Sequence, residues 1–150
     1  MYKSRLSRYW SFCEEHPPNA EEDAAADAEA LTFGLEADLE AALRKGLDQL
    51  EPGLHLADEG QQRKVASGFI DIFARDSGGK PVVIELKANQ TRPEAVAQVL
   101  GYMADIAAEE GVDVRGFLIG ADHHPKVEAA ARAVPNLALR RYAYRFSFEA

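Results

Sequence analysis

The stretch GFIDIFARDSGGKPVVIELK, residues 68–87, decides the fold. It holds two strongly apolar runs, residues 68–74 and 81–87, separated by a segment rich in aspartate, serine and glycine. Apolar runs of this length on either side of such a turn predict a β-hairpin. Both runs are apolar on their two faces, which is typical of strands in the covered interior of a sheet.

Three charged residues interrupt the hairpin strands: Asp71 in the first, and Glu85 and Lys87 in the second. Side chains on a strand alternate between its faces, so Glu85 and Lys87 share one face. The turn places Asp71 opposite a position between Val83 and Leu86, and its carboxylate therefore lies beside Glu85 or diagonal to it. Like charges that face each other across a strand pair destabilise it, and a bound cation removes that cost.

Two carboxylates on a rigid sheet suit Mg²⁺, because this ion keeps part of its hydration shell. The pattern therefore predicts Asp71 and Glu85 as metal ligands. From one pleat away, Lys87 could orient or deprotonate an attacking water, or stabilise charge that develops on a phosphate. The alternative is an ordinary Glu–Lys pair on a solvated strand face, with Asp71 as a lone edge carboxylate.

A helix is expected over residues 35–50, where leucines recur at core spacing. These are Leu35, Leu39, Leu43, Leu47 and Leu50. Glu36 lies inside this stripe, whereas Asp38 projects toward water. We expect Glu36 to be the third acid of the metal site, or else to sit in the first turn of the helix, where it complements the helix dipole or a cap.

The chain is expected to divide into an acidic N-terminal arm or linker over residues 1–32 and one folded domain over residues 33–150. Beyond the hairpin, Thr91 and Glu94 form a capping-box pattern that opens a second helix, which ends near Gly111. Further expected elements are strands at residues 54–65, 112–120 and 137–148 and a short helix at residues 125–134. The expected order is α-β-β-β-α-β-α-β. Since strands joined through a helix are normally parallel, this order predicts an α/β fold with a mixed sheet flanked by helices on both faces.

Other polar residues are candidates for substrate contact. Gln98 and Tyr102 are one turn apart on the second helix and lie off its apolar stripe, so both could reach substrate or simply face water. Basic side chains alternate with aromatic ones near the C-terminus, which suits phosphate contact plus stacking or, for the aromatics, core packing. The basic residues are Arg140, Arg141 and Arg145.

The formal net charge of −8 argues against a protein that coats nucleic acid nonspecifically, because such binding requires a cationic surface. A bound divalent cation would reverse the sign locally. No run approaches the ~20 apolar residues of a membrane span, so no membrane association is expected. The single cysteine, Cys13, excludes an internal disulfide framework and fits a cytoplasmic location.

Four segments in order resemble the nuclease domain of the NucS family, which belongs to the PD-(D/E)XK superfamily of restriction-endonuclease-like folds. They are FGLEADL at residues 33–39, GFIDI at 68–72, VIELK at 83–87, and the helix that bears Gln98 and Tyr102. The Glu-x-Lys element alone is weak, and the ordered set is more specific. The resemblance covers roughly residues 33–148.

This resemblance implies Mg²⁺- or Mn²⁺-dependent hydrolysis of DNA phosphodiesters. Asp71 and Glu85 would bind metal, Lys87 would position the nucleophilic water, Glu36 would complete the acidic cluster, and Gln98 and Tyr102 would lie near the active site. Family members carry a substantial N-terminal domain for DNA binding and dimerisation, whereas here only a segment of about thirty residues with a net negative charge comes before the matching part. A homodimer or a separate specificity subunit is therefore an expected partner.

Two other functions remain open from the sequence. One is a noncatalytic module on the same fold that binds nucleic acid or protein, which the acidic surface favours. The other is a nuclease that acts on RNA or on single-stranded ends, since the chemistry of cleavage is shared. The DNA structure or sequence that is preferred, the oligomeric state and the biological pathway do not follow from these residues.

Overall fold

The computed structural model describes residues 20–150, and the expectations for Cys13 and for the first part of the arm lie outside them. The chain divides into two units, Met1–Gly34 and Leu35–Ala150. The first described element, α2 (Ala20–Lys45), is one continuous helix that runs through this boundary. The expected helix over residues 35–50 thus begins earlier and ends earlier than its leucine pattern suggests. After Gly46 the chain tightens into a short 3₁₀ helix, η1 (Leu47–Gln49).

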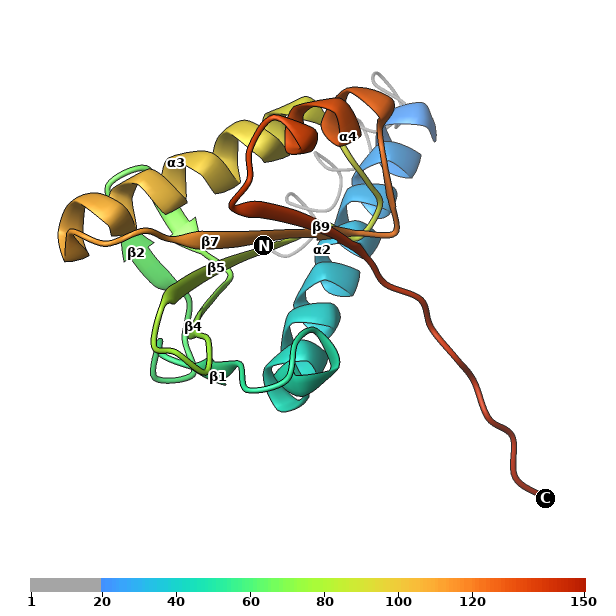
Figure 1. Ribbon diagram of the computed structural model, residues 1–150. Helices are drawn as coiled ribbons and strands as arrows, with labels where there is room; N and C mark the ends of the chain where they lie inside the picture. Colours follow the sequence, from blue (N-terminus) through green and yellow to red (C-terminus); the bar gives the residue numbers. More distant parts are fainter. Residues whose placement is uncertain (1–19) are drawn as a thin grey trace, which may run out of the picture. The chain divides into compact units, whose positions relative to one another are not determined.

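A five-stranded sheet forms the centre of the second unit (Figure 1). Its strands, in spatial order, are β1 (His55–Leu56), β4 (Ile72–Arg75), β5 (Pro81–Leu86), β7 (Arg115–Gly120) and β9 (Leu137–Arg141). The first three are antiparallel neighbours, and β7 and β9 join in parallel. The fold is therefore α/β with a mixed sheet, as expected.

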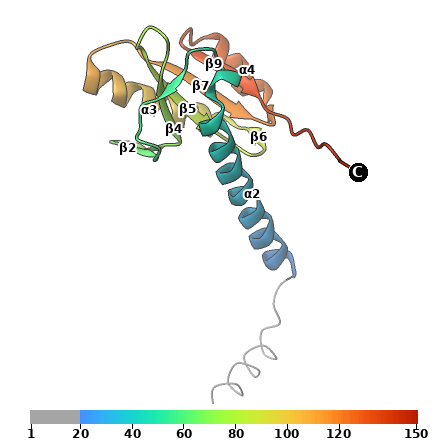
Figure 2. The same cartoon turned by 90° about the horizontal axis from the view of Figure 1, so that it is seen from below.

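Helices cover both faces of this sheet (Figures 1 and 2). On one face, α3 (Pro93–Glu110) and α4 (Pro125–Arg132) enclose a core that includes Phe73, Val83 and Leu118. On the other face, the end of α2 contributes Leu39 and Leu43 against the alternate side chains of the same strands. Strands buried on both faces explain why the hairpin sequence is apolar at nearly every position.

The hairpin of β4 and β5 has a definite register. Ile72 pairs with Ile84 and Phe73 with Val83, so extension by one residue places Asp71 opposite Glu85. Asp71 itself lies just outside β4, and its carboxylate is near enough to Glu85 for the Asp71 charge to raise the pKa of Glu85.

Asp71 also marks the point where the chain changes sheets. The expected strand over residues 68–74 is two strands: β3 (Gly68–Ile70) pairs with β2 (Arg63–Val65) in a separate hairpin, and β4 belongs to the central sheet. Ile70 and Ile72 accordingly enter different core clusters. A local break of this kind redirects the side chain at the break, here the carboxylate of Asp71.

Three further differences separate the expected elements from the observed ones. The expected strand over residues 54–65 is divided into β1 and β2, and the last strand ends at Arg141 rather than near residue 148. Thr91 is not the cap of α3: it lies in a short strand, β6 (Gln90–Thr91), which pairs in parallel with β8 (Asp122–His123), and the N-cap is Arg92. Thr91 Oγ1 instead lies 2.6 Å from His123 Nδ1 in the interior, which removes it from the helix end.

Within the described part of the chain, no helix is long and apolar enough to span a bilayer.

Candidate metal-dependent active site

Asp71 is held at the end of β5 by main-chain and side-chain contacts. Its Oδ2 accepts a hydrogen bond of 2.9 Å from the Leu86 amide, and its Oδ1 accepts one of 3.3 Å from Gln62 Nε2. Its main-chain oxygen accepts a 2.7 Å bond from Arg44 Nη2. These contacts fix the carboxylate between the two hairpins and α2.

Glu85 is buried, with 2% of its surface exposed. Its Oε1 lies 3.2 Å from Lys87 Nζ, whereas its Oε2 is buried and accepts no hydrogen bond from any described residue. A buried carboxylate oxygen without a partner costs free energy unless a proton or a cation satisfies it. The described residues leave this oxygen unsatisfied, so it is the atom of the site where a proton or a cation would be needed.

Glu36 reaches the same end of β5 from α2. Its Oε1 accepts a 3.1 Å hydrogen bond from the amide of Ala88, the residue that follows Lys87. Because α2 begins at Ala20, Glu36 lies about four turns inside the helix, and the alternative role in a first turn is wrong. The structure thus brings Glu36, Asp71, Glu85 and Lys87 together around one strand end.

The electrostatics of the acids reflect their crowding. Burial raises the pKa of Asp71 to about 6, and the nearby Glu40 and Glu36 carboxylates also raise it. Burial, followed by the Asp71 charge, raises the pKa of Glu85 to about 8. Each added negative charge at this strand end is therefore unfavourable in the chain alone.

For Lys87, in contrast to the acids, the surroundings favour the charged form. Burial disfavours its charged form, but the Glu85 carboxylate, together with those of Glu36 and Asp71, raises the pKa of the ammonium above its ordinary range. An ammonium that holds its proton can orient water or neutralise charge on a phosphate oxygen, and it is a poor base. Of the roles expected for Lys87, the raised pKa is in line with these two rather than with deprotonation of water.

The donor set fits a hard divalent cation. In the described part of the chain, no three His, Cys, Asp or Glu side chains already have the separations of a metal site. Asp71 and Glu85 nevertheless provide the oxygen ligands that Mg²⁺ takes from one or two carboxylates, with water and phosphate completing its shell. The free Oε2 of Glu85 is a ligand atom without another use.

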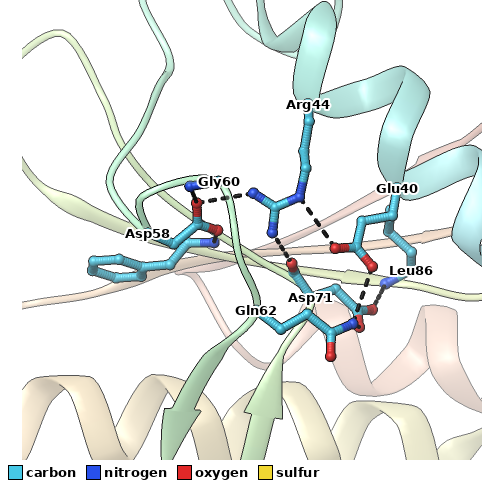
Figure 3. Close-up of polar contacts among 8 residues, drawn as sticks. Glu40, Arg44, Asp58, Gly60, Gln62, Asp71 and Leu86 are labelled. Atoms are coloured by element: carbon cyan, nitrogen blue, oxygen red, sulfur yellow. Dashed lines mark hydrogen bonds and ion pairs between the residues drawn. The ribbon is translucent and has the colours of Figure 1, made fainter.

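A network around Arg44 joins α2 to Asp71 (Figure 3). Besides the Asp71 main chain, Arg44 contacts Glu40 at 3.1 Å and Asp58 at 2.9 Å. The Asp58 side chain is fully buried and also accepts the Phe73 amide at 3.0 Å. This network sets the distance between the helix that carries Glu36 and the residue Asp71.

Glu40, Arg44 and Gln62 were not expected at the site from the sequence. Gln62 Nε2 donates to Glu40 Oε2 at 3.0 Å as well as to Asp71, and so it bridges the two acids (Figure 3). A signal was present, because Glu36, Glu40 and Arg44 recur at four-residue spacing and therefore share a helix face.

Gln98 lies at the site, and Tyr102 supports it from the core. A cavity of about 310 Å³ is lined by Glu36, Lys87, Arg92 and Gln98, among others. Gln98 Nε2 donates to the Tyr102 hydroxyl at 2.9 Å. The expected position of Tyr102 off the apolar stripe is wrong: the residue is 4% exposed and belongs to the core beneath α3.

The C-terminal arginines lie away from the acids. Arg140 and Arg141 line a different cavity, of about 370 Å³, between α2 and the end of β9. Arg141 is paired with Asp122 and Glu128, and Arg145 lies beyond the last strand in an exposed segment. From this segment only Tyr142 approaches the site, where its hydroxyl donates to the carbonyl of Ala88.

Most of the described chain matches a known protein family. Residues 35–141 match the family described as the endonuclease NucS C-terminal domain. The endonuclease NucS 2 of Halobacterium salinarum is 36% identical over 110 residues, which are 73% of this chain and 43% of that protein. The endonuclease NucS of Thermococcus kodakarensis is 32% identical over 96 residues, 63% of this chain and 37% of that protein.

Solved structures agree with the fold. A repair endonuclease from Pyrococcus abyssi superposes with a TM-score of 0.66 at 23% identity, over 71% of this chain and 46% of that one. A complex of EndoMS with double-stranded DNA gives a TM-score of 0.66 at 25% identity, over 73% of this chain and 44% of that one. The chain spans less than half the length of these relatives.

Proposed function

This chain belongs to the family of endonuclease NucS C-terminal domains, and on that premise we propose that it hydrolyses phosphodiester bonds of DNA with Mg²⁺ or Mn²⁺ as cofactor. The observation that carries the proposal is the buried, unpartnered Oε2 of Glu85 beside Asp71. The set of Asp71, Glu85 and Lys87 supports assignment of the site to the PD-(D/E)XK type. The EndoMS relative, which has been captured with double-stranded DNA, supports DNA as the substrate.

Each site residue has a task in this proposal. Asp71 and Glu85 hold the cation, which when bound supplies a Lewis acid for the phosphate and its attacking water. The Lys87 ammonium orients that water and offsets charge on the phosphate oxygens. Glu36 completes the acidic cluster, and Gln98 lines the cavity beside Lys87.

The proposal also covers contacts to DNA outside the acidic site. Because the chain matches less than half of its relatives, we propose that a second copy or another chain supplies the remaining contacts to DNA. The arginines at 140, 141 and 145 remain candidates for phosphate contact outside the cavity.

The test is cleavage of labelled duplex, flap and single-stranded DNA and of RNA, each with Mg²⁺, Mn²⁺ or EDTA. We expect metal-dependent cleavage of DNA, and a loss of at least about 100-fold for Asp71→Asn, Glu85→Gln and Lys87→Ala. Asp38→Asn is the matched control, because Asp38 is exposed on the same helix as Glu36 and should cut as the wild type does.

A noncatalytic binding module is the competing function, and the net charge of −8 favours it. The same cleavage assay distinguishes the nuclease from the binding module. Binding of DNA without cleavage in either metal, unchanged in Lys87→Ala, would establish the module and refute the nuclease, whereas cleavage of RNA alone would change the substrate and leave the site intact.

A further inference from the structure

The small hairpin of β2 and β3 has two different faces. Its register pairs Arg63 with Ile70 and Lys64 with Phe69. The inner face holds Ile70, which is buried, and Arg63, whose guanidinium lies 4.3 Å from the centre of the Phe73 ring. The outer face holds Lys64 and Phe69, both exposed, with 55% of the Phe69 surface open to solvent.

This outer face leads directly to the acids. Gln62 directly precedes β2, and the alternation of side chains along an extended chain puts it on the same side as Lys64. Gln62 contacts Asp71, which follows β3 one residue after Ile70. The pair of Lys64 and Phe69 is therefore one pleat from Asp71, at a separation of roughly 7 Å along the strand.

Lys64 is the cation of this face that remains available. Arg44 is engaged by Glu40 and Asp58, and Lys87 is engaged by Glu85. Lys64 forms no ion pair with another residue in the described part of the chain. An exposed ammonium without an ion pair is a contact point for a polyanionic strand.

An isolated exposed phenylalanine needs no explanation. Phe69 is not isolated in this sense, since it pairs across the strands with a lysine that has no ion pair, near Gln62, which contacts Asp71. A cation beside an exposed aromatic ring is the combination that holds single nucleic-acid strands, through phosphate contact and base stacking.

We propose that Lys64 and Phe69 form a subsite for the nucleotide adjacent to the phosphate at the acidic cluster. Lys64 contacts the phosphate of that nucleotide, and Phe69 stacks on its base. The inference rests on the proposed nuclease function and adds to it, because stacking requires a base that is not paired at this position. The hairpin then favours substrates with an unpaired nucleotide beside the cut.

The test is binding of the full chain, in EDTA so that nothing is cut, to a DNA with 2-aminopurine in an unpaired segment. Stacking quenches the fluorescence of this base. We expect Phe69→Ala to abolish the quenching and to weaken binding by about 5- to 100-fold, and Phe69→Trp to restore both. Phe69→Leu should behave as Phe69→Ala does, since it keeps the apolar surface and removes the ring.

Lys64→Ala should weaken binding. It should also lower, by about one, the number of phosphate contacts obtained from the slope of log binding constant against log salt concentration. Phe148→Ala and Lys80→Ala are matched controls at exposed positions outside this face, and neither should change binding. All of these side chains are exposed, so thermal unfolding should be unchanged in every variant.

The result of the quenching and binding test does not depend on whether the chain cleaves DNA. Loss of quenching in Phe69→Ala supports the subsite even in a chain that cuts no substrate. Equal quenching and affinity in wild type, Phe69→Ala and Lys64→Ala overturn it even in an active nuclease, and absence of binding by the wild-type chain overturns it as well. Equal DNA binding together with loss of binding to another protein would assign the face to a protein partner instead.

Discussion

Glu85 shows at the scale of one residue how a candidate metal site costs stability. Its pKa is raised by burial from 4.5 to about 8, so the folded protein without metal holds a proton that the unfolded chain releases at lower pH. The folded state then binds more protons than the unfolded state between about pH 4.5 and 8, and its stability falls as pH rises through this window. Asp71, with its pKa raised to about 6, adds to the fall in the lower part of the window.

We expect Glu85→Gln in EDTA to lose most of this pH dependence, because glutamine does not titrate. At pH 8 the variant should be more stable than the wild type by a few kcal/mol, since each pKa unit corresponds to about 1.4 kcal/mol. Urea unfolding at several pH values between 5 and 8 measures this difference. Glu149→Gln, at an exposed position, is the control and should follow the wild-type curve; a Glu85→Gln curve parallel to the wild type would contradict the expectation.

At the scale of elements, Arg44 connects α2 with the chain on both sides of the Asp71 break. Arg44→Met would leave the Asp58 carboxylate, whose side chain is fully buried, without its cation. Removal of one partner of a buried pair costs about 3–5 kcal/mol. We expect the double variant Arg44→Met with Asp58→Asn to lose less stability than the sum of the two single variants.

A double-mutant cycle in urea measures this coupling, and Arg132→Met, exposed on α4, is the control. Affinity for Mn²⁺ gives a second readout. Because Arg44 holds the Asp71 main chain, Arg44→Lys should weaken metal binding more than it lowers stability. Additive losses, or unchanged metal affinity, would show that Arg44 acts on the fold alone.

The elements also show which parts could be predicted from the sequence. Charges inside strands that are apolar on both faces located Asp71, Glu85 and Lys87, and helical spacing located Glu36, because these signals are local. The Arg44 network depends on where α2 lies against the sheet, which no local pattern contains. The predictions for Thr91 and Tyr102 were wrong for the same reason. Thr91 contacts His123 in the interior instead of capping the helix. Tyr102 is buried in the core because Gln98 donates a hydrogen bond to its hydroxyl.

For the whole molecule, the two core clusters indicate where its stability resides. Among the described residues, every member of both clusters lies between Leu39 and Tyr142. We therefore expect removal of residues 1–34 to leave the unfolding temperature within about 3 °C of that of the full chain. Calorimetry of both chains checks this, and a much lower transition would show that the first unit takes part in the core.

The change of sheets at Asp71 connects the proposed nucleotide subsite to the acid through the main chain. The β2–β3 hairpin and the central sheet share no strand, and one residue, Asp71, separates β3 from β4. If a ligand on the outer face displaced the hairpin, the backbone torsions of Asp71 would carry that movement to a residue whose carboxylate Leu86 holds and whose main-chain oxygen Arg44 holds. A hairpin that carries no catalytic group could in this way alter the alignment of a carboxylate beside it, and the loop at residues 66 and 67 would be the place to vary that alignment without changing the acids themselves.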